Sequence, residues 1–245
     1  LKYYRKMLST RSENFGLYVS SPFEQKKRCL MICTDVSSKY TRRGYEEYRK
    51  IAEYIARMAW QKKGNYMVFF PSYKLMEDVY QIYQEEFAVS WVRCICQSSA
   101  MTESEREEFL QEFREQEDTL LGFCVMGGIF SEGIDLMGDR LIGAAVVGTG
   151  LPQVSAEREI LKNYYDRKGE QGFDYAYRYP GMNKVLQAAG RVIRTKEDRG
   201  TILLMDERFC QREYRTLFPQ EWQEIKYCSL ETVEEHIRDF WATVH

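Results

Sequence analysis

Histidine is scarce in this sequence. Only two histidines occur, His236 and His245, and both lie beyond the last strand-like segment. Histidine is the usual general acid or base near neutral pH and the commonest metal ligand in proteins. The scarcity therefore argues against histidine-based catalysis, and we expect no metal site in the chain.

Cysteine pairs with metal-binding spacing are also missing. No two Cys-x-x-Cys units occur that could bind zinc or an iron–sulfur cluster. We expect reduced and mostly buried thiols, because a free cysteine usually behaves as a small apolar side chain. The seven cysteines are Cys29, Cys33, Cys94, Cys96, Cys124, Cys210 and Cys228.

Long hydrophobic runs are absent as well. The longest, residues 141–151, is about half of what a bilayer requires and is interrupted by glycines. No charged and then apolar leader opens the chain. We expect a soluble, cytoplasmic protein with no membrane partner. The start at Leu1, inside a helix-like segment, suggests a fragment of something longer.

Both common glycine fingerprints for phosphate binding are lacking. None of the 16 glycines falls in the Gly-x-x-x-x-Gly-Lys-Ser/Thr pattern of a P-loop. No Gly-x-Gly-x-x-Gly follows the first strand-like segment. The nearest pair, Gly148 and Gly150, leads into Pro152, which has no backbone hydrogen to donate to a pyrophosphate. The chain is not expected to cradle a triphosphate or dinucleotide by either route.

The residues that are present suit one compact α/β domain over residues 1–245. Hydrophobic residues make up 44% of the chain, the net charge is −2, and no repeat or linker interrupts it. Apolar runs of strand length alternate with helical patterns, which predicts a mostly parallel sheet with helices on both faces. The predicted strands are residues 28–36, 66–70, 91–96, 120–126, 141–147 and 201–205. The predicted helices are residues 43–62, 75–87, 103–116, 156–168, 182–194 and 207–217, and a capping box at Thr102 and Glu105 opens the third.

Three polar segments beside predicted strands could meet a ligand. They are PSYK at residues 71–74, GGIFSEGID at 127–135 and QAAGRVIR at 187–194. Ligands of open parallel sheets bind at the carboxyl ends of the strands, so the segments that follow strands receive most weight.

The segment QAAGRVIR is predicted to be helical with a polar stripe. Helical spacing places Gln187, Arg191 and Arg194 on one face, and two guanidinium forks with an amide suit a phosphate. Gly190 is unfavourable inside a helix and suggests a close approach there. From spacing alone, a solvated face or ion pairs with carboxylates is the favoured alternative.

The segment GGIFSEGID is either a tight turn or a ligand-binding loop. Its glycines, Gly127, Gly128 and Gly133, permit unusual backbone angles that would present Glu132 and Asp135 to a ligand. The turn is the favoured interpretation when this segment is taken by itself.

In their order along the chain, these segments resemble motifs IV, V and VI of XPD/DinG-type superfamily 2 DNA helicases, most closely the bacterial DinG branch. The similarity rests on GNYMVFFPSY at residues 64–73, GGIFSEGIDL at 127–136, GTGLP at 148–152 and YPGMNKVLQAAGRVIR at 179–194. SPF at 21–23 and DRGTILLMDERF at 198–209 fit the same family, so the resemblance covers nearly the whole chain. It implies a RecA-like fold, similar to that of P-loop NTPases, without a P-loop of its own.

The family's motor consists of two RecA-like domains that clamp ATP with Mg²⁺. The first carries the P-loop, the DEAH box and usually a four-cysteine iron–sulfur cluster, none of which occurs in this chain. The chain therefore resembles the second domain alone. The resemblance implies single-stranded DNA and the N-terminal RecA-like domain of the same polypeptide as partners, and a role in DNA repair.

The resemblance also assigns roles to residues of motifs V and VI. Gln187, Arg191 and Arg194 match motif VI, whose arginines reach the terminal phosphate of ATP held by the other domain. The other residues assigned to the nucleotide cleft are Gly133, Asp135, Glu132 and Gly190, and Ser131 is assigned to the DNA.

Motif IV implies a contact with the single-strand backbone. Ser72 offers a hydroxyl and a backbone amide for a phosphate, and Tyr73 is equally suited to stacking on a base or to packing half-buried. Lys74, Arg42 and Arg43 are further phosphate candidates, although exposed basic residues are usually plain surface.

Two other functions stay open. One is a non-catalytic nucleic-acid or protein-interaction module on a degenerate helicase fold. The other is a small-molecule enzyme on a Rossmann-like sheet, for which a fingerprint and a nucleophile with its base are missing.

Overall fold

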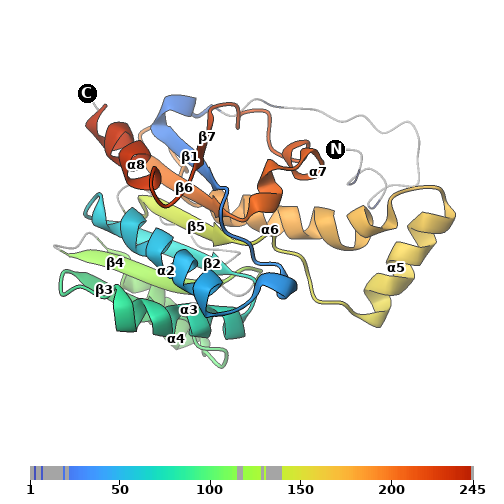
Figure 1. Ribbon diagram of the computed structural model, residues 1–245, viewed down its shortest axis with the longest axis horizontal. Helices are drawn as coiled ribbons and strands as arrows, with labels where there is room; N and C mark the ends of the chain where they lie inside the picture. Colours follow the sequence, from blue (N-terminus) through green and yellow to red (C-terminus); the bar gives the residue numbers. More distant parts are fainter. Residues whose placement is uncertain are drawn as a thin grey trace.

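The chain forms a seven-stranded parallel sheet with helices on both faces (Figure 1). The structure is a computed structural model and describes residues 3, 7, 19, 22–114, 118–127, 130 and 140–243. The strand order is β3-β4-β2-β5-β6-β1-β7, and every neighbouring pair runs parallel. The predicted parallel α/β architecture is confirmed.

Six strands occur where the sequence predicts them. They are β1 (Arg28–Cys33), β2 (Asn65–Phe70), β3 (Val92–Cys96), β4 (Thr119–Val125), β5 (Gly143–Val147) and β6 (Gly200–Met205). Strands β2, β4, β5 and β6 are buried at every position, which explains why they read as continuous apolar runs. The seventh strand, β7 (Ile225–Cys228), is short, lies at the sheet edge and is half exposed, so it has no such run.

The helices agree less closely with the prediction. They are α2 (Tyr45–Trp60), α3 (Tyr73–Glu86), α4 (Glu103–Gln111), α5 (Ala156–Arg167), α6 (Tyr179–Ala189), α7 (Arg212–Arg215) and α8 (Val233–Ala242). The capping box at the start of α4 is confirmed. The helix expected over residues 207–217 is instead a 3₁₀ turn, η5 (Glu207–Cys210), followed by α7, and α8 was not predicted.

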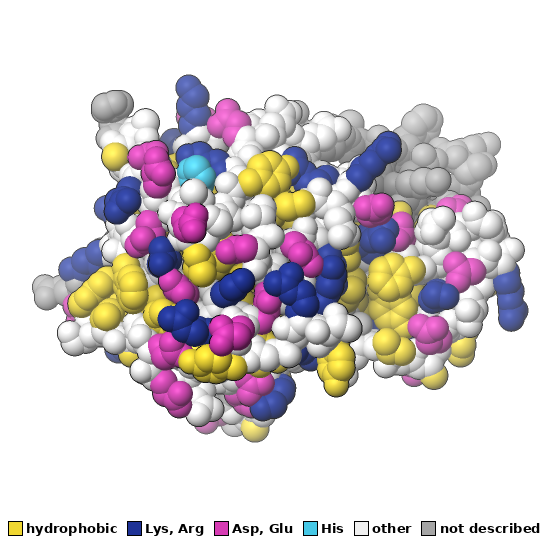
Figure 2. Space-filling model, viewed as in Figure 1, with side chains coloured by type: hydrophobic (Ala, Val, Ile, Leu, Met, Phe, Trp, Pro, Cys, Tyr) yellow, Lys and Arg dark blue, Asp and Glu magenta, His cyan; other side chains and the backbone are white. Residues whose placement is uncertain are grey.

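Two hydrophobic cores lie on the two faces of the sheet. In β2, Val68 and Phe70 face one core, whereas Met67 and Phe69 face the other, as the two-residue period of a strand requires. Helices α2, α3 and α8 cover the first face, and α4 and α6 cover the second. On the surface, acidic and basic side chains are intermixed over the face seen in Figure 2, in keeping with a net charge near zero.

A lobe built from α5 and the π-helical turn η4 (Asp174–Arg178) projects beyond the sheet (Figure 1). Its centre is aromatic, since the rings of Tyr165 and Tyr175 stack with centroids 3.9 Å apart. The turn leads directly into α6, so the lobe positions the helix that precedes the candidate arginines.

The cysteines are free thiols of differing exposure. Four are buried, Cys94 and Cys96 are half-buried, and Cys210 is exposed. Among the described residues, no helix combines the length and the apolar character needed to cross a membrane.

Candidate nucleotide and nucleic-acid sites

The candidate residues lie at two opposite edges of the sheet. Ser72, Tyr73 and Lys74 follow β2 and lie at the carboxyl edge. Arg191 and Arg194 precede β6 and lie at the amino edge. With about 3.3 Å of rise per residue, a six-residue strand such as β6 separates the two edges by about 20 Å.

Unlike Ser72–Lys74, the segment QAAGRVIR does not lie at the carboxyl ends of the strands. Helix α6 begins beside the carboxyl end of β5, where Gly181 packs against the backbone of Thr149 and Gly150. It ends near the start of β6, where the Val192 side chain lies against Gly200. A helix that connects two parallel strands must run back across the sheet, so its last turn reaches the amino edge.

Helix α6 also ends before the two arginines. Its last residue is Ala189, and Gly190 is the C-cap, with φ of −68°. Beyond it the Asp198 carboxylate accepts hydrogen bonds from the backbone amides of Arg194 (2.6 Å) and Thr195 (2.7 Å) and from the Thr195 hydroxyl (2.7 Å). An acceptor that binds backbone amides in a loop competes with the helix for them, and so the predicted single helical stripe is not formed.

The two arginines differ in exposure. The Arg191 residue is only 6% exposed, whereas Arg194 is exposed, as is Gln187 on the last full turn of α6. Their positions still bring two guanidinium groups to one loop. Of the two, only Arg194 presents its residue surface to solvent.

The glycine-rich segment after β4 is described only at its start. Ser131, Glu132, Gly133 and Asp135 lie outside the described residues. Gly127 has a left-handed φ of 72°, and a Cβ at this position would lie 2.8 Å from Cε of Lys184 on α6. Burial lowers the pKa of Lys184, and the nearby charge of Arg158 lowers it further. Sequence reasoning missed this lysine, because nothing in its local pattern shows that α6 passes over the segment.

The polar groups after β2 take part in local structure. The Ser72 hydroxyl caps α3 by accepting a hydrogen bond from the amide of Leu75 (3.3 Å). Tyr73 is half-buried, and its hydroxyl accepts a hydrogen bond from Nε2 of Gln97 (2.8 Å). Lys74 is exposed and pairs with Asp78 at 2.6 Å. For Tyr73 the geometry matches the packing alternative, and burial raises the pKa of its phenol.

A buried ion pair organises the carboxyl edge beside β1 and β6. The Asp206 carboxylate, fully buried after β6, accepts hydrogen bonds from Nε and Nη2 of Arg208, both at 2.8 Å. It also accepts from the amide and the hydroxyl of Ser38, both at 2.8 Å. Burial alone would raise the pKa of Asp206, but the hydrogen bonds and charge of Arg208 outweigh it and the pKa is lowered.

The segment after β1 is tied to the same edge by further ion pairs. Arg42 bridges two carboxylates, Glu47 at 2.8 Å and Glu207 at 3.2 Å. Lys39 pairs with the other oxygen of Glu207 at 2.8 Å. Arg42 and Arg43 are both exposed, but only Arg42 is held by these carboxylates.

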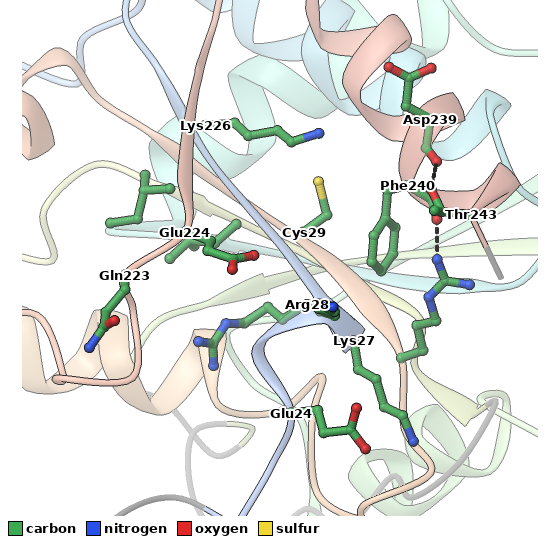
Figure 3. A pocket seen from close by; sticks show the side chains of 14 residues that line it. Glu24, Lys27, Arg28, Cys29, Gln223, Glu224, Lys226, Asp239, Phe240 and Thr243 are labelled. Atoms are coloured by element: carbon green, nitrogen blue, oxygen red, sulfur yellow. Dashed lines mark hydrogen bonds between the residues drawn. The ribbon is translucent and has the colours of Figure 1, made fainter. Parts of the chain in front are cut away.

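A cavity of about 710 Å³ opens at the amino ends of β1 and β7 (Figure 3). Its wall mixes charges of both signs, including Lys27, Lys226, Glu24 and Glu224. Beneath them lies Cys29, whose pKa burial raises to about 11. None of the candidate site residues lines this cavity. Nowhere in the described ranges do three or more His, Cys, Asp or Glu side chains group together as a metal site would need.

A family model described as the helicase C-terminal domain matches residues 55–225. This range contains β2 to β6 and both candidate edges. The chain belongs to this helicase family.

Two relatives of this helicase C-terminal domain are much longer proteins. The ATP-dependent DNA helicase XPD of Sulfolobus acidocaldarius is 29% identical over 208 residues, which are 79% of this chain and 35% of XPD. The 3'-5' exonuclease DinG of Bacillus subtilis is 24% identical over 206 residues, which are 82% of this chain and 21% of DinG. The chain thus spans about a third or less of the length of these two relatives.

A solved structure titled XPD_APO has the same fold. It superposes with a TM-score of 0.68 at 22% sequence identity, covering 82% of this chain and 40% of the other. The predicted RecA-like architecture of a helicase C-terminal domain is confirmed at the level of the fold.

Proposed function

We propose that this chain is the second motor domain of an ATP-dependent DNA helicase. In this role it supplies an arginine finger to ATP held by an N-terminal RecA-like domain, and part of the groove for single-stranded DNA. Membership of the helicase C-terminal family and similarity to a protein named ATP-dependent DNA helicase XPD support the proposal.

The observation that carries the nucleotide half is the loop between α6 and β6. Asp198 holds the backbone of Arg194 and Thr195 in place, while Arg194 itself is exposed. The chain has no P-loop, and in this proposal the phosphate that meets this guanidinium is held by the other domain. An arginine presented across a domain boundary stabilises the charge that develops on a transferred phosphoryl group.

Other groups are assigned to the first domain. The P-loop, the Mg²⁺ ion and any iron–sulfur cluster of the polypeptide belong there in this proposal. This chain by itself would then neither hydrolyse ATP nor unwind DNA, because it holds the arginines without the phosphate cradle.

The test uses the full polypeptide that contains this chain. We expect Arg194→Ala to lower ATP hydrolysis stimulated by single-stranded DNA by about 10³-fold or more, as for other arginine fingers, with DNA affinity nearly unchanged. Arg238→Ala, which removes an exposed arginine from α8, is the matched control and should hydrolyse ATP normally.

Normal hydrolysis in the Arg194→Ala protein would rule out the finger assignment. The competing function, a non-catalytic interaction module, predicts a polypeptide without an intact P-loop and DEAH box, and no hydrolysis in the unmodified protein.

A further inference from the structure

A second tyrosine at the carboxyl edge, Tyr40, is far more exposed than the half-buried Tyr73. Tyr40 lies in the 3₁₀ turn η2 (Tyr40–Arg42), which follows β1. Its residue is 83% exposed, more than any other large hydrophobic residue in the described ranges. Among eighteen tyrosines it has no distinctive sequence signal, and its availability emerges only from the structure.

An arginine accompanies this ring. The guanidinium carbon of Arg43 lies over the Tyr40 ring, 5.4 Å from its centroid. Arg43 is exposed, and none of the described carboxylates lies within ion-pair distance of it. This contrasts with Arg42, which is held by Glu47 and Glu207. The pair therefore offers an aromatic surface and an uncompensated cation to a ligand.

The segment that leads into η2 is held by hydrogen bonds to two buried carboxylates. The amide of Ser38 is bound by the buried Asp206, and the amide of Ser37 donates to the buried Glu47. Both carboxylates also bind arginines, so the segment is attached to β6 and to α2 at once. A segment whose backbone is already ordered loses little conformational entropy when it binds a ligand.

The η2 turn and the start of α3 follow the carboxyl ends of β1 and β2, respectively. Both segments act electrostatically on Tyr48 of α2. Burial raises the pKa of its phenol, while the charges of Arg43 and Lys74 act to lower it. The two basic side chains therefore lie within electrostatic reach of one phenol. Lys74 is paired with Asp78, so Arg43 is the cation of the two that has no ion pair with a described carboxylate.

We propose that Tyr40 and Arg43 form a stacking platform for single-stranded DNA, with a base on the Tyr40 ring and an adjoining phosphate on Arg43. Exposed aromatic rings bind bases of any sequence because every base has a π face, and a neighbouring cation neutralises the backbone. This inference rests on the proposed nucleic-acid function and names residues for it that the motifs do not include.

The test measures binding of a fluorescein-labelled oligothymidine of 20 nucleotides to the full 245-residue chain by anisotropy. We expect Tyr40→Ala to weaken binding at least about fivefold, and Tyr40→Phe, which keeps the ring, to bind as the unmodified chain does. Tyr227→Ala is the matched control, since Tyr227 is 51% exposed on β7 and has Arg215 over its ring at 5.6 Å. It should bind normally.

Salt dependence separates stacking from charge. Arg43→Ala should reduce the slope of log affinity against log salt by about 0.7, while Tyr40→Ala should leave the slope unchanged. Unchanged affinity in Tyr40→Ala, or an equal loss in Tyr227→Ala, would overturn the platform but not the helicase assignment. If the unmodified chain binds no oligothymidine, the platform and the nucleic-acid part of the proposed function both fail.

Discussion

The two edges of the sheet use a buried aspartate in different ways. At the carboxyl edge, Asp206 binds side-chain nitrogens of Arg208 and so holds that guanidinium within the fold. At the amino edge, Asp198 binds the backbone amide of Arg194, while the residue itself is exposed. An aspartate that holds the side chain makes a structural ion pair. An aspartate that holds the backbone fixes the loop that carries an exposed arginine.

The largest expected effect is the loss of ATP turnover when the exposed Arg194 of the amino edge is removed. Arg194→Ala should cost about 10³-fold or more in ATP turnover of the full polypeptide, with a free energy of unfolding close to that of the unmodified protein. Arg191→Ala should also lose turnover, and it should lower the free energy of unfolding by about 2–4 kcal/mol because Arg191 is buried. Urea denaturation and ATPase assays of both variants give the comparison. Equal stability losses in the two variants would contradict the difference in exposure.

Breaking the buried pair tests the carboxyl edge. Asp206→Ala should lower the free energy of unfolding by about 3–5 kcal/mol, because it leaves Arg208 without its carboxylate in a mostly buried position. Lys74→Ala removes an exposed pair of the same edge and should cost less than about 1 kcal/mol. The two variants can be compared by urea denaturation of the 245-residue chain, and similar losses would show that Asp206 contributes no more than a surface pair.

Acid should act on the same carboxylate. Since the folded-state pKa of Asp206 lies below its ordinary value of 3.8, the stability it contributes is present at neutral pH and is lost as the pH falls below about 4. Asp206→Asn should remove this part of the acid dependence. The measurement is the urea midpoint of both proteins between pH 7 and pH 3, and parallel curves would speak against the lowered pKa.

The smallest expected effects are those of substitutions at Ser72, which distinguish its role as a helix cap from a role in phosphate binding. Ser72→Ala should cost about 1 kcal/mol of stability, because it removes the N-cap of α3. Ser72→Asp keeps a capping oxygen and adds a negative charge, so it should retain stability yet bind oligothymidine more weakly than the unmodified chain. Unchanged DNA affinity in Ser72→Asp would remove Ser72 from the predicted DNA contact.

The sheet could be predicted from the sequence because its strands are buried on both faces. Strands such as β2 and β5 are apolar at nearly every position and need no knowledge of their neighbours. Strand β7 has only four residues, of which one is buried, so it offers no comparable signal. The end of α6 was missed because the competing acceptor, Asp198, acts through a loop beyond the helix.

The candidate sites could be predicted only in part. The order of the motifs identifies the family, but the separation of the segments onto two edges depends on the course of α6 across the sheet. The Ser38–Asp206 contact joins residues far apart in the sequence, and it holds the segment that leads to the exposed Tyr40. Local patterns carry no information about such long-range contacts.

The separation of the edges is most directly tested by mapping where single-stranded DNA touches the protein. An oligonucleotide containing 5-iododeoxyuridine would be photocrosslinked to the full polypeptide and the modified peptides identified by mass spectrometry. We expect crosslinks within this chain at the carboxyl edge, at Tyr40 and in residues 71–74. Crosslinks confined to the amino-edge loop, residues 190–199, would contradict the assignment of the DNA to the carboxyl edge and of the Arg194 loop to the nucleotide.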